Sequence, residues 1–202
     1  MKKFFMTVAI ALGCVAANAQ TNGYIGGEVQ LWRNASHGAN ETTFSIAPEI
    51  GFNIADDLAI GTTIGYAYHF NHDAAVAVKT NAFVIKPYAR YTCVKMGNFS
   101  LLTDFGVGFA TYKNKVGDAD ATDAACAYEI GIRPGICYSF NNRWCAVAHV
   151  GFLGYRDCNN KTYKIGNAAQ TEVETIDTNP LGSNGFGFSL DNSLSLSLYY
   201  NF

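Results

Sequence analysis

The sequence has few charged residues for its length. Asp, Glu, Lys and Arg make up 15% of its 202 residues, against about 25% in ordinary soluble domains. The 14 basic residues are outnumbered by 16 acidic ones, which argues against a basic surface for nucleic acid or anionic lipid. Low charge together with 14% aromatic residues and 20 glycines is typical of β-structure that exposes much of its surface to something other than water.

Long hydrophobic runs are also missing from most of the chain. Beyond the first 19 residues, no segment approaches 18 consecutive apolar residues, whereas a transmembrane helix needs about 20. A chain that crosses a bilayer without helices has to close into a β-barrel, because only closure satisfies every backbone group in lipid. If this protein lies in a membrane, it is therefore expected to be a barrel.

The N-terminal segment predicts export. Lys2 and Lys3 precede an apolar run at residues 4–15, and Ala17-Asn18-Ala19 has the small-x-small pattern of a cleavage site. These features predict a secretory signal peptide at residues 1–19 and a single mature domain at residues 20–202.

Apolar residues alternate with polar or small ones along most of the mature chain. Ile46, Ile50 and Phe52 share one face of such a segment, and Glu49 lies on the other. A period of two predicts β-strands with one apolar face. Eight strands are expected, of which the seventh has an ambiguous phase and the eighth a bulge near Asp191: residues 24–32, 44–54, 58–70, 80–93, 99–113, 124–140, 143–155 and 186–202.

The connections between these strands alternate in length. Those at residues 55–57, 94–98 and 141–142 are short, whereas long polar segments occupy residues 33–43, 71–79, 114–123 and 156–185. Outer-membrane barrels combine an even strand number with short periplasmic turns and long extracellular loops. The pattern predicts an all-β fold, an eight-stranded antiparallel up-and-down transmembrane β-barrel with both termini on the periplasmic side.

A hairpin-sized motif occurs three times. Residues 44–52, 83–91 and 130–138 alternate in the same way and carry a proline at the same position, namely Pro48, Pro87 and Pro134. This repetition indicates one hairpin unit used three times. Because proline removes a hydrogen bond from a sheet, a shared local device is expected at the three positions.

The last strand carries apolar residues at every second position and ends on Phe202. With the Pro-Tyr-Ala-Arg-Tyr segment at residues 87–91 and the Gly-aromatic strand ends, the chain resembles small eight-stranded outer-membrane barrels of the outer-membrane protein A/X type. More narrowly, it resembles the porin-family outer membrane protein β-barrel domain proteins of the Bacteroidetes, over residues 20–202. The resemblance implies a Gram-negative cell outer membrane, contact with its lipid and insertion by the barrel-assembly machinery through a terminal signal: Leu196, Leu198, Tyr200 and Phe202.

The polar faces of the strands are expected to fill the barrel. An eight-stranded barrel is just wide enough for side chains to occupy its lumen, and unpaired buried charges are costly. A mutually paired network that closes the lumen is therefore predicted, with a narrow ion path along the same charges as the alternative. Its members are Glu28, Glu49, Lys86, Arg90, Asp104, Glu129 and Arg133.

Five cysteines lie in the mature chain without the close spacing of a zinc site, and no metal or cofactor is expected. If the sixth and seventh strands pair about a three-residue turn at 140–142, Cys137 faces Cys145, and Cys126 and Cys158 meet near the outer rim. Cys137–Cys145 and Cys126–Cys158 are candidate disulfides in an oxidising periplasm, with Cys93 left over.

Histidines offer little support for an enzyme. The pairing register above places His149 in the lumen opposite Arg133. Ser36-His37 and His72-Asp73 lie in predicted loops, where adjacent residues do not fix the geometry of a nucleophile and its base. No catalytic residue is predicted, although lipid A-modifying enzymes of similar size exist.

The predicted function is structural: an outer-membrane barrel that displays four extracellular loops, with an unknown partner. The longest loop contains an alternating segment at residues 172–176, which is expected to extend the sheet beyond the membrane. A minor porin for small solutes is the alternative. A secreted barrel for an apolar ligand is disfavoured, because such barrels keep their apolar face inside.

Overall fold

The chain folds into a closed antiparallel β-barrel of eight strands. The computed structural model describes residues 23–36, 39–71, 78–116, 119–120, 125–159, 163–165, 172–174, 180–181, 184–189 and 195–202. The predicted signal peptide and the predicted bulge near Asp191 lie outside these ranges. Among the described residues, no helix is long and apolar enough to cross a membrane.

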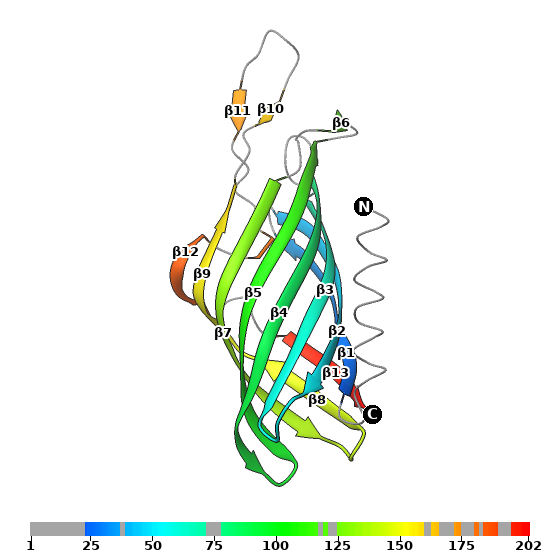
Figure 1. The fold of residues 1–202 in the computed structure, drawn as a ribbon. Helices are drawn as coiled ribbons and strands as arrows, with labels where there is room; N and C mark the ends of the chain where they lie inside the picture. The colour runs from blue at the N-terminus through cyan, green and yellow to red at the C-terminus, as the bar shows by residue number, and fades with distance from the viewer. Residues whose placement is uncertain are drawn as a thin grey trace, which may run out of the picture.

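The first five barrel strands follow one another along the chain and pair in sequence order (Figure 1). They are β1 (Gly23–Ser36), β2 (Ala39–Asn53), β3 (Leu58–Asn71), β4 (Val78–Met96) and β5 (Phe99–Val116). A short β6 (Ala119–Asp120) folds back on the end of β5, and the sixth barrel strand is β7 (Ala125–Ser139).

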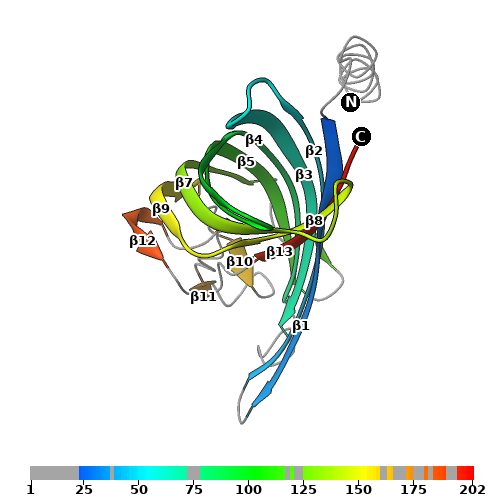
Figure 2. The same cartoon turned by 90° about the horizontal axis from the view of Figure 1, so that it is seen from below.

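Each of the last two barrel strands consists of two segments. The seventh comprises β8 (Trp144–His149) and β9 (Phe152–Cys158), and the eighth comprises β12 (Gly185–Ser189) and β13 (Ser195–Asn201). The barrel closes where β1 pairs with β13, with Tyr24 opposite Asn201 and Gly27 opposite Leu198. Figure 2 shows this closure from the end that carries the short turns.

Several strands extend further into the long connections than the sequence predicts. β1 and β2 remain paired as far as Ser36 and Ala39, and β4 and β5 as far as Val78 and Val116. Most residues in these extensions are polar, so the alternation of apolar residues that marks the rest of each strand is lost there. Backbone pairing continues without it.

The last long connection contains a separate hairpin instead of an extension of the barrel sheet. β10 (Tyr163–Ile165) and β11 (Glu172–Glu174) pair only with each other among the described strands. In Figure 1 they lie at the end opposite the short turns. The expectation that residues 172–176 would continue the barrel sheet is therefore wrong.

The predicted orientation of the two strand faces is confirmed. Glu49, Arg90, Asp104 and Glu129 are buried in the interior. The outer face is apolar over much of the barrel, and its exposed side chains include Ile25, Val29, Phe44, Ile46, Ile60, Phe83, Phe105, Phe109, Ile130, Ile132, Ile136, Leu153, Phe188, Leu196 and Leu198.

The three repeated prolines all point outward and have different neighbours. The pairing register is the same on both sides of Pro48 and Pro87, although the ladder lacks pairs beside them. Opposite Pro134, whose carbonyl accepts a hydrogen bond from the Val150 N–H, the seventh strand is interrupted. Only this third proline faces a break in its partner, so the expected shared device is not a bulge repeated three times.

The interruption lies at Val150 and Gly151, and it reverses the phase of the strand. Before it, Val147 and His149 face inward, whereas after it Phe152 and Arg156 do. Gly151 adopts a φ of 82°, a left-handed conformation that side chains disfavour. This reversal explains why residues 143–155 show no single alternation in the sequence.

Candidate functional site

A buried cluster around Arg90 occupies the half of the lumen nearer the short turns. Arg90 on β4 lies opposite Asp104 on β5, and its Nε and Nη2 donate to the two Asp104 oxygens at 2.8 Å. Nη2 also lies 3.2 Å from Glu49 Oε1 on β2, and His149 Nε2 on β8 lies 2.8 Å from Asp104 Oδ2. All four residues are buried. Because they come from β2, β4, β5 and β8, the cluster joins strands on opposite sides of the lumen.

Three tyrosines enclose this cluster. The rings of Tyr24, Tyr88 and Tyr199 lie 5.0 to 5.5 Å from the Arg90 guanidinium, within the range of cation–π contacts. The Tyr24 and Tyr88 hydroxyls are 2.7 Å apart, and Tyr88 donates a hydrogen bond to Glu49. The buried charges are thereby screened from water and supplied with hydrogen bonds, as burial requires.

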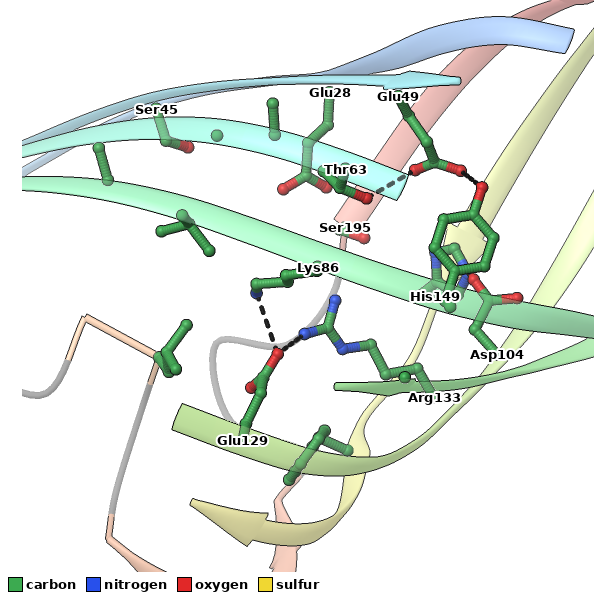
Figure 3. Close-up of a pocket in the computed structure, with 18 of the residues that line it drawn as sticks. Glu28, Ser45, Glu49, Thr63, Lys86, Asp104, Glu129, Arg133, His149 and Ser195 are labelled. Atoms are coloured by element: carbon green, nitrogen blue, oxygen red, sulfur yellow. Dashed lines mark hydrogen bonds and ion pairs between the residues drawn. The ribbon is translucent and has the colours of Figure 1, made fainter. Parts of the chain in front are cut away.

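A second cluster surrounds Glu129 on β7, nearer the long connections (Figure 3). Lys86 Nζ lies 3.2 Å from Oε1, Arg156 Nε lies 2.9 Å from Oε2, and Arg133 also pairs with this carboxylate. Glu129 is only 3% exposed. The neighbouring strand leaves room for it at Gly108, where a Cβ would lie 2.5 Å from Glu129 Cγ.

A cavity of about 440 Å³ lies between the two clusters and extends from them towards the long connections. Its lining extends from Glu49 and Asp104 to Thr43 and Leu181, on the side of the long connections. Glu28 lines the same space, and Figure 3 shows it on the far side of the cavity from Glu129. The prediction that side chains fill the lumen therefore holds for the short-turn half alone.

Apolar side chains close the lumen between the Arg90 cluster and the short turns. Tyr24, Leu102, Val147 and Tyr199 belong to one buried hydrophobic cluster, and Val147 and Tyr199 are each 1% exposed. Another buried hydrophobic cluster lies towards the long connections, where Leu181 packs against alanines and Tyr112 of the barrel wall. The cavity is thus closed at the short-turn end.

The structure brings six of the seven predicted lumen charges into the two clusters. Glu28, the seventh, lines the cavity. Sequence reasoning missed Arg156, because the phase reversal at Gly151 hides the inward face of β9. His149 does enter the lumen, but it lies opposite Gly135 rather than Arg133 and contacts Asp104.

The predicted cysteine arrangement requires correction. The register between β7 and β8 differs by two residues from the prediction, so Cys145 faces Ser139 and Cys137 faces Val147. The Cys137 and Cys145 side chains still pack in the same hydrophobic cluster. Cys126 is exposed on the outer face, whereas Cys158 packs against the interior cluster. The five described cysteines are thiols and not disulfides.

The remaining predicted residues fall in separate places. Leu196, Leu198 and Phe202 are exposed on the outer face of the last strand, and Tyr200 packs edge-on against Trp144. His37 and the pair His72-Asp73 lie outside the described residues. Within the described ranges, no group of three or more His, Cys, Asp or Glu side chains is arranged to hold a metal ion.

Comparison with known proteins finds similar solved structures at low sequence identity. No family model and no curated protein matches the sequence. Among solved structures, neisserial surface protein A is 14% identical over 90% of this chain and 96% of its own, with a TM-score of 0.46. E. coli outer membrane protein W is 14% identical over 90% and 98%, with a TM-score of 0.48. The β-domain of the Bordetella autotransporter BrkA is 16% identical over 77% and 64%, with a TM-score of 0.47.

Proposed function

We propose that the protein is an integral outer-membrane β-barrel that is closed to conduction and displays its long connections outside the cell. The observation that carries this proposal is the inverted distribution of side chains. Isoleucine, leucine, valine and phenylalanine cover the outer face, while the charges pair inside. An exposed apolar surface of this extent is unstable in water and suits the hydrocarbon layer of a bilayer.

Aromatic side chains at both ends of the barrel support a membrane position. Near the short turns, Trp144 packs on Tyr200 and Phe99 on Tyr138, with ring centroids 5.1 and 4.7 Å apart. Nearer the long connections, Tyr128 and Tyr155 lie side by side on the outer face, 6.2 Å apart. Outer-membrane barrels carry such aromatic girdles at the two interfaces.

The closed short-turn half favours a structural role over that of a porin. Leu102, Val147 and Tyr199 fill the lumen there, and the Arg90 cluster lies next to them on the side of the long connections. A continuous water path would have to separate these groups, which would leave buried charges unpaired at high cost. The charged interior also disfavours a soluble carrier of apolar ligands.

We further propose that the barrel has no enzymatic activity, and that outer-membrane lipid, the assembly machinery and an external loop partner are its contacts. Leu196, Leu198, Tyr200 and Phe202 are proposed to form the assembly signal. The exposed outward position of three of them leaves this strand accessible along its apolar face.

Two measurements test the proposal. Cell fractionation with heat-modifiability on gels should find the protein in the outer membrane as a barrel that migrates differently before boiling. Planar bilayer recording should then show no steady conductance. A soluble periplasmic protein would overturn the membrane assignment, and a stable nanosiemens conductance would instead favour a minor porin.

A further inference from the structure

The ladder that closes the barrel covers only part of the two strands that it joins. Residues 24–27 of β1 pair with residues 198–201 of β13. Both strands continue beyond the last pair, and the structure describes them there. Residues 28–30 of β1 nevertheless form no pairs with residues 195–197 of β13. We call this unpaired stretch of the barrel wall the seam.

Nearer the long connections, the eighth strand does not return to β1. Among the described strands, β12 pairs with β9 alone, and β1 and β12 lie apart in both Figure 1 and Figure 2. The β1–β13 ladder ends at Gly27, whose φ of 149° is one that glycine adopts more readily than other residues. A Cβ at Gly27 would also lie 2.4 Å from the Ala47 carbonyl oxygen. The seam therefore begins at a backbone geometry that suits glycine.

The most exposed large apolar side chains of the described residues lie on the three strands that border this opening. Phe186 and Phe188 of β12 are 80% and 60% exposed, Leu196 of β13 is 69% exposed, and Val29 of β1 is 68% exposed. Outward side chains elsewhere on the wall, such as Phe105, are more covered by their neighbours. The opening is thus flanked by apolar groups that lack a neighbouring strand.

The lumen cavity reaches the seam from the inside. Glu28 of β1 and both Ser195 and Ser197 of β13 line this cavity. Backbone groups without ladder partners are costly in lipid, but they are tolerated where they border a water-filled cavity. Buried hydrophobic clusters lie towards both ends of the barrel, and Leu181 belongs to the one near the long connections. The seam therefore gives the cavity a lateral approach through the wall.

The charges around the cavity balance one another. Four carboxylates and three cations line it, and Arg90 beside them supplies the fourth cation. Such a lining favours a polar group without net charge. The volume of about 440 Å³ lies within the range of about 300–1,000 Å³ for small-molecule sites. The charged residues are Glu28, Glu49, Asp104, Glu129, Lys86, Arg133 and Arg156.

We propose that a single-chain amphiphile with a zwitterionic head group enters the cavity from the bilayer through the seam. The head group lies between Glu28 and the Glu129 cluster, which face each other across the cavity (Figure 3). The acyl chain passes through the seam and lies against Val29, Leu196 and Phe188. This inference rests on the proposed membrane position of the barrel and adds a lipid-binding site to it.

Disulfide trapping tests the seam in the full-length barrel, refolded into lipid nanodiscs and oxidised with glutathione disulfide. Ile25→Cys with Tyr200→Cys places two thiols at a ladder pair, and Val29→Cys with Leu196→Cys places two across the seam. A disulfide needs Cβ atoms about 4 Å apart, so the ladder pair should react about tenfold faster or more. Equal rates would show a closed wall and overturn the proposal. A dimer linked through position 29 would show that a second copy covers the edge, and would also overturn it.

Photolabelling in nanodiscs of diacyl phosphatidylcholine tests the ligand. The probe is lysophosphatidylcholine with a diazirine beside its head group. Peptides that contain the cavity-lining Glu28 and Ser197 should be labelled saturably, and an excess of unlabelled lysophosphatidylcholine should remove this labelling. Labelling of the outward-facing Ile136 should instead rise with probe concentration without saturating. The absence of a saturable component at the cavity would overturn the site.

Phe186→Ser with Phe188→Ser should weaken the saturable labelling by about fivefold or more, because apolar contacts with the acyl chain are lost. Phe105→Ser with Phe109→Ser is the matched control on the outer face away from the seam, and it should label as the unchanged protein does. Equal weakening in the two variants would contradict binding at the seam. A heat-modifiable barrel in the membrane without saturable labelling would overturn this inference alone, whereas a protein outside the membrane would overturn the proposed function as well.

Discussion

Arg90 and Asp104 form a two-point ion pair between neighbouring strands, with both nitrogen–oxygen distances at 2.8 Å. The pair extends to Glu49 on one side and to His149 on the other. Four strands of the barrel are thereby connected through the lumen by side chains, in addition to their backbone ladders. The guanidinium is the shared partner of both carboxylates.

Replacing Arg90 with Gln should destabilise the barrel strongly. The change leaves Asp104 and Glu49 buried without their cation, and loss of one partner from a buried ionic cluster costs about 3–5 kcal/mol. Urea unfolding of the barrel in lipid vesicles, followed by tryptophan fluorescence, measures the loss. Lys95→Gln breaks an exposed pair at a short turn and should cost less than about 1 kcal/mol. Equal losses would show that the Arg90 cluster adds nothing beyond a surface pair.

A charge on the outer face should be costly only where lipid surrounds it. Ile132 lies mid-way along β7 with its side chain exposed on that face. Ile132→Arg should lower the free energy of unfolding by about 2–4 kcal/mol, the cost of arginine at the bilayer midplane. Met96→Arg, at the end of β4, should cost about 0–1 kcal/mol. Equal costs in vesicles would argue against a membrane layer centred on Ile132.

The strand faces could be predicted from sequence because an apolar outer face and a charged interior impose a strict period of two. Ile130 and Ile132 alternate with Glu129 and Arg133, and no other arrangement buries those charges together. Strand ends were less predictable, since backbone pairing in the extensions of β1 and β2 does not require apolar side chains.

The partners within the lumen could not be predicted, because they depend on register and on one backbone reversal. Arg156 faces inward only because Gly151 shifts the phase of its strand. A two-residue difference in register separated Cys137 from its expected partner. The cavity likewise depends on which side chains meet across the barrel, and alternation along single strands carries no such information.

Gly151→Ala tests the phase reversal in the seventh strand. A side chain at a φ of 82° is disfavoured by about 1–2 kcal/mol, so the variant should lose that much stability in urea unfolding. Gly187→Ala on β12 is the control, since a Cβ there would have open space around it, and it should change stability by less than about 0.5 kcal/mol. A neutral Gly151→Ala would mean that the strand reverses its phase elsewhere.

Cysteine mapping tests the assignment of the two faces. Cys126 and Cys158 point to opposite sides of the wall, so non-reducing peptide mapping should find no bond between them, even after mild oxidation. A membrane-permeant maleimide should modify Cys93 and Cys126, which are exposed, faster than buried Cys145. Recovery of a Cys126–Cys158 peptide would contradict the inward position of Cys158.

The most direct test of the membrane orientation is paramagnetic relaxation in lipid nanodiscs that contain a nitroxide on the acyl chain. Methyl resonances of the outward-facing Ile130, Ile132 and Ile136 should broaden strongly, while those of inward-facing Leu102 and Val147 should keep their intensity. Broadening of the inward methyls with sparing of the isoleucines would contradict a barrel that turns its apolar face to lipid.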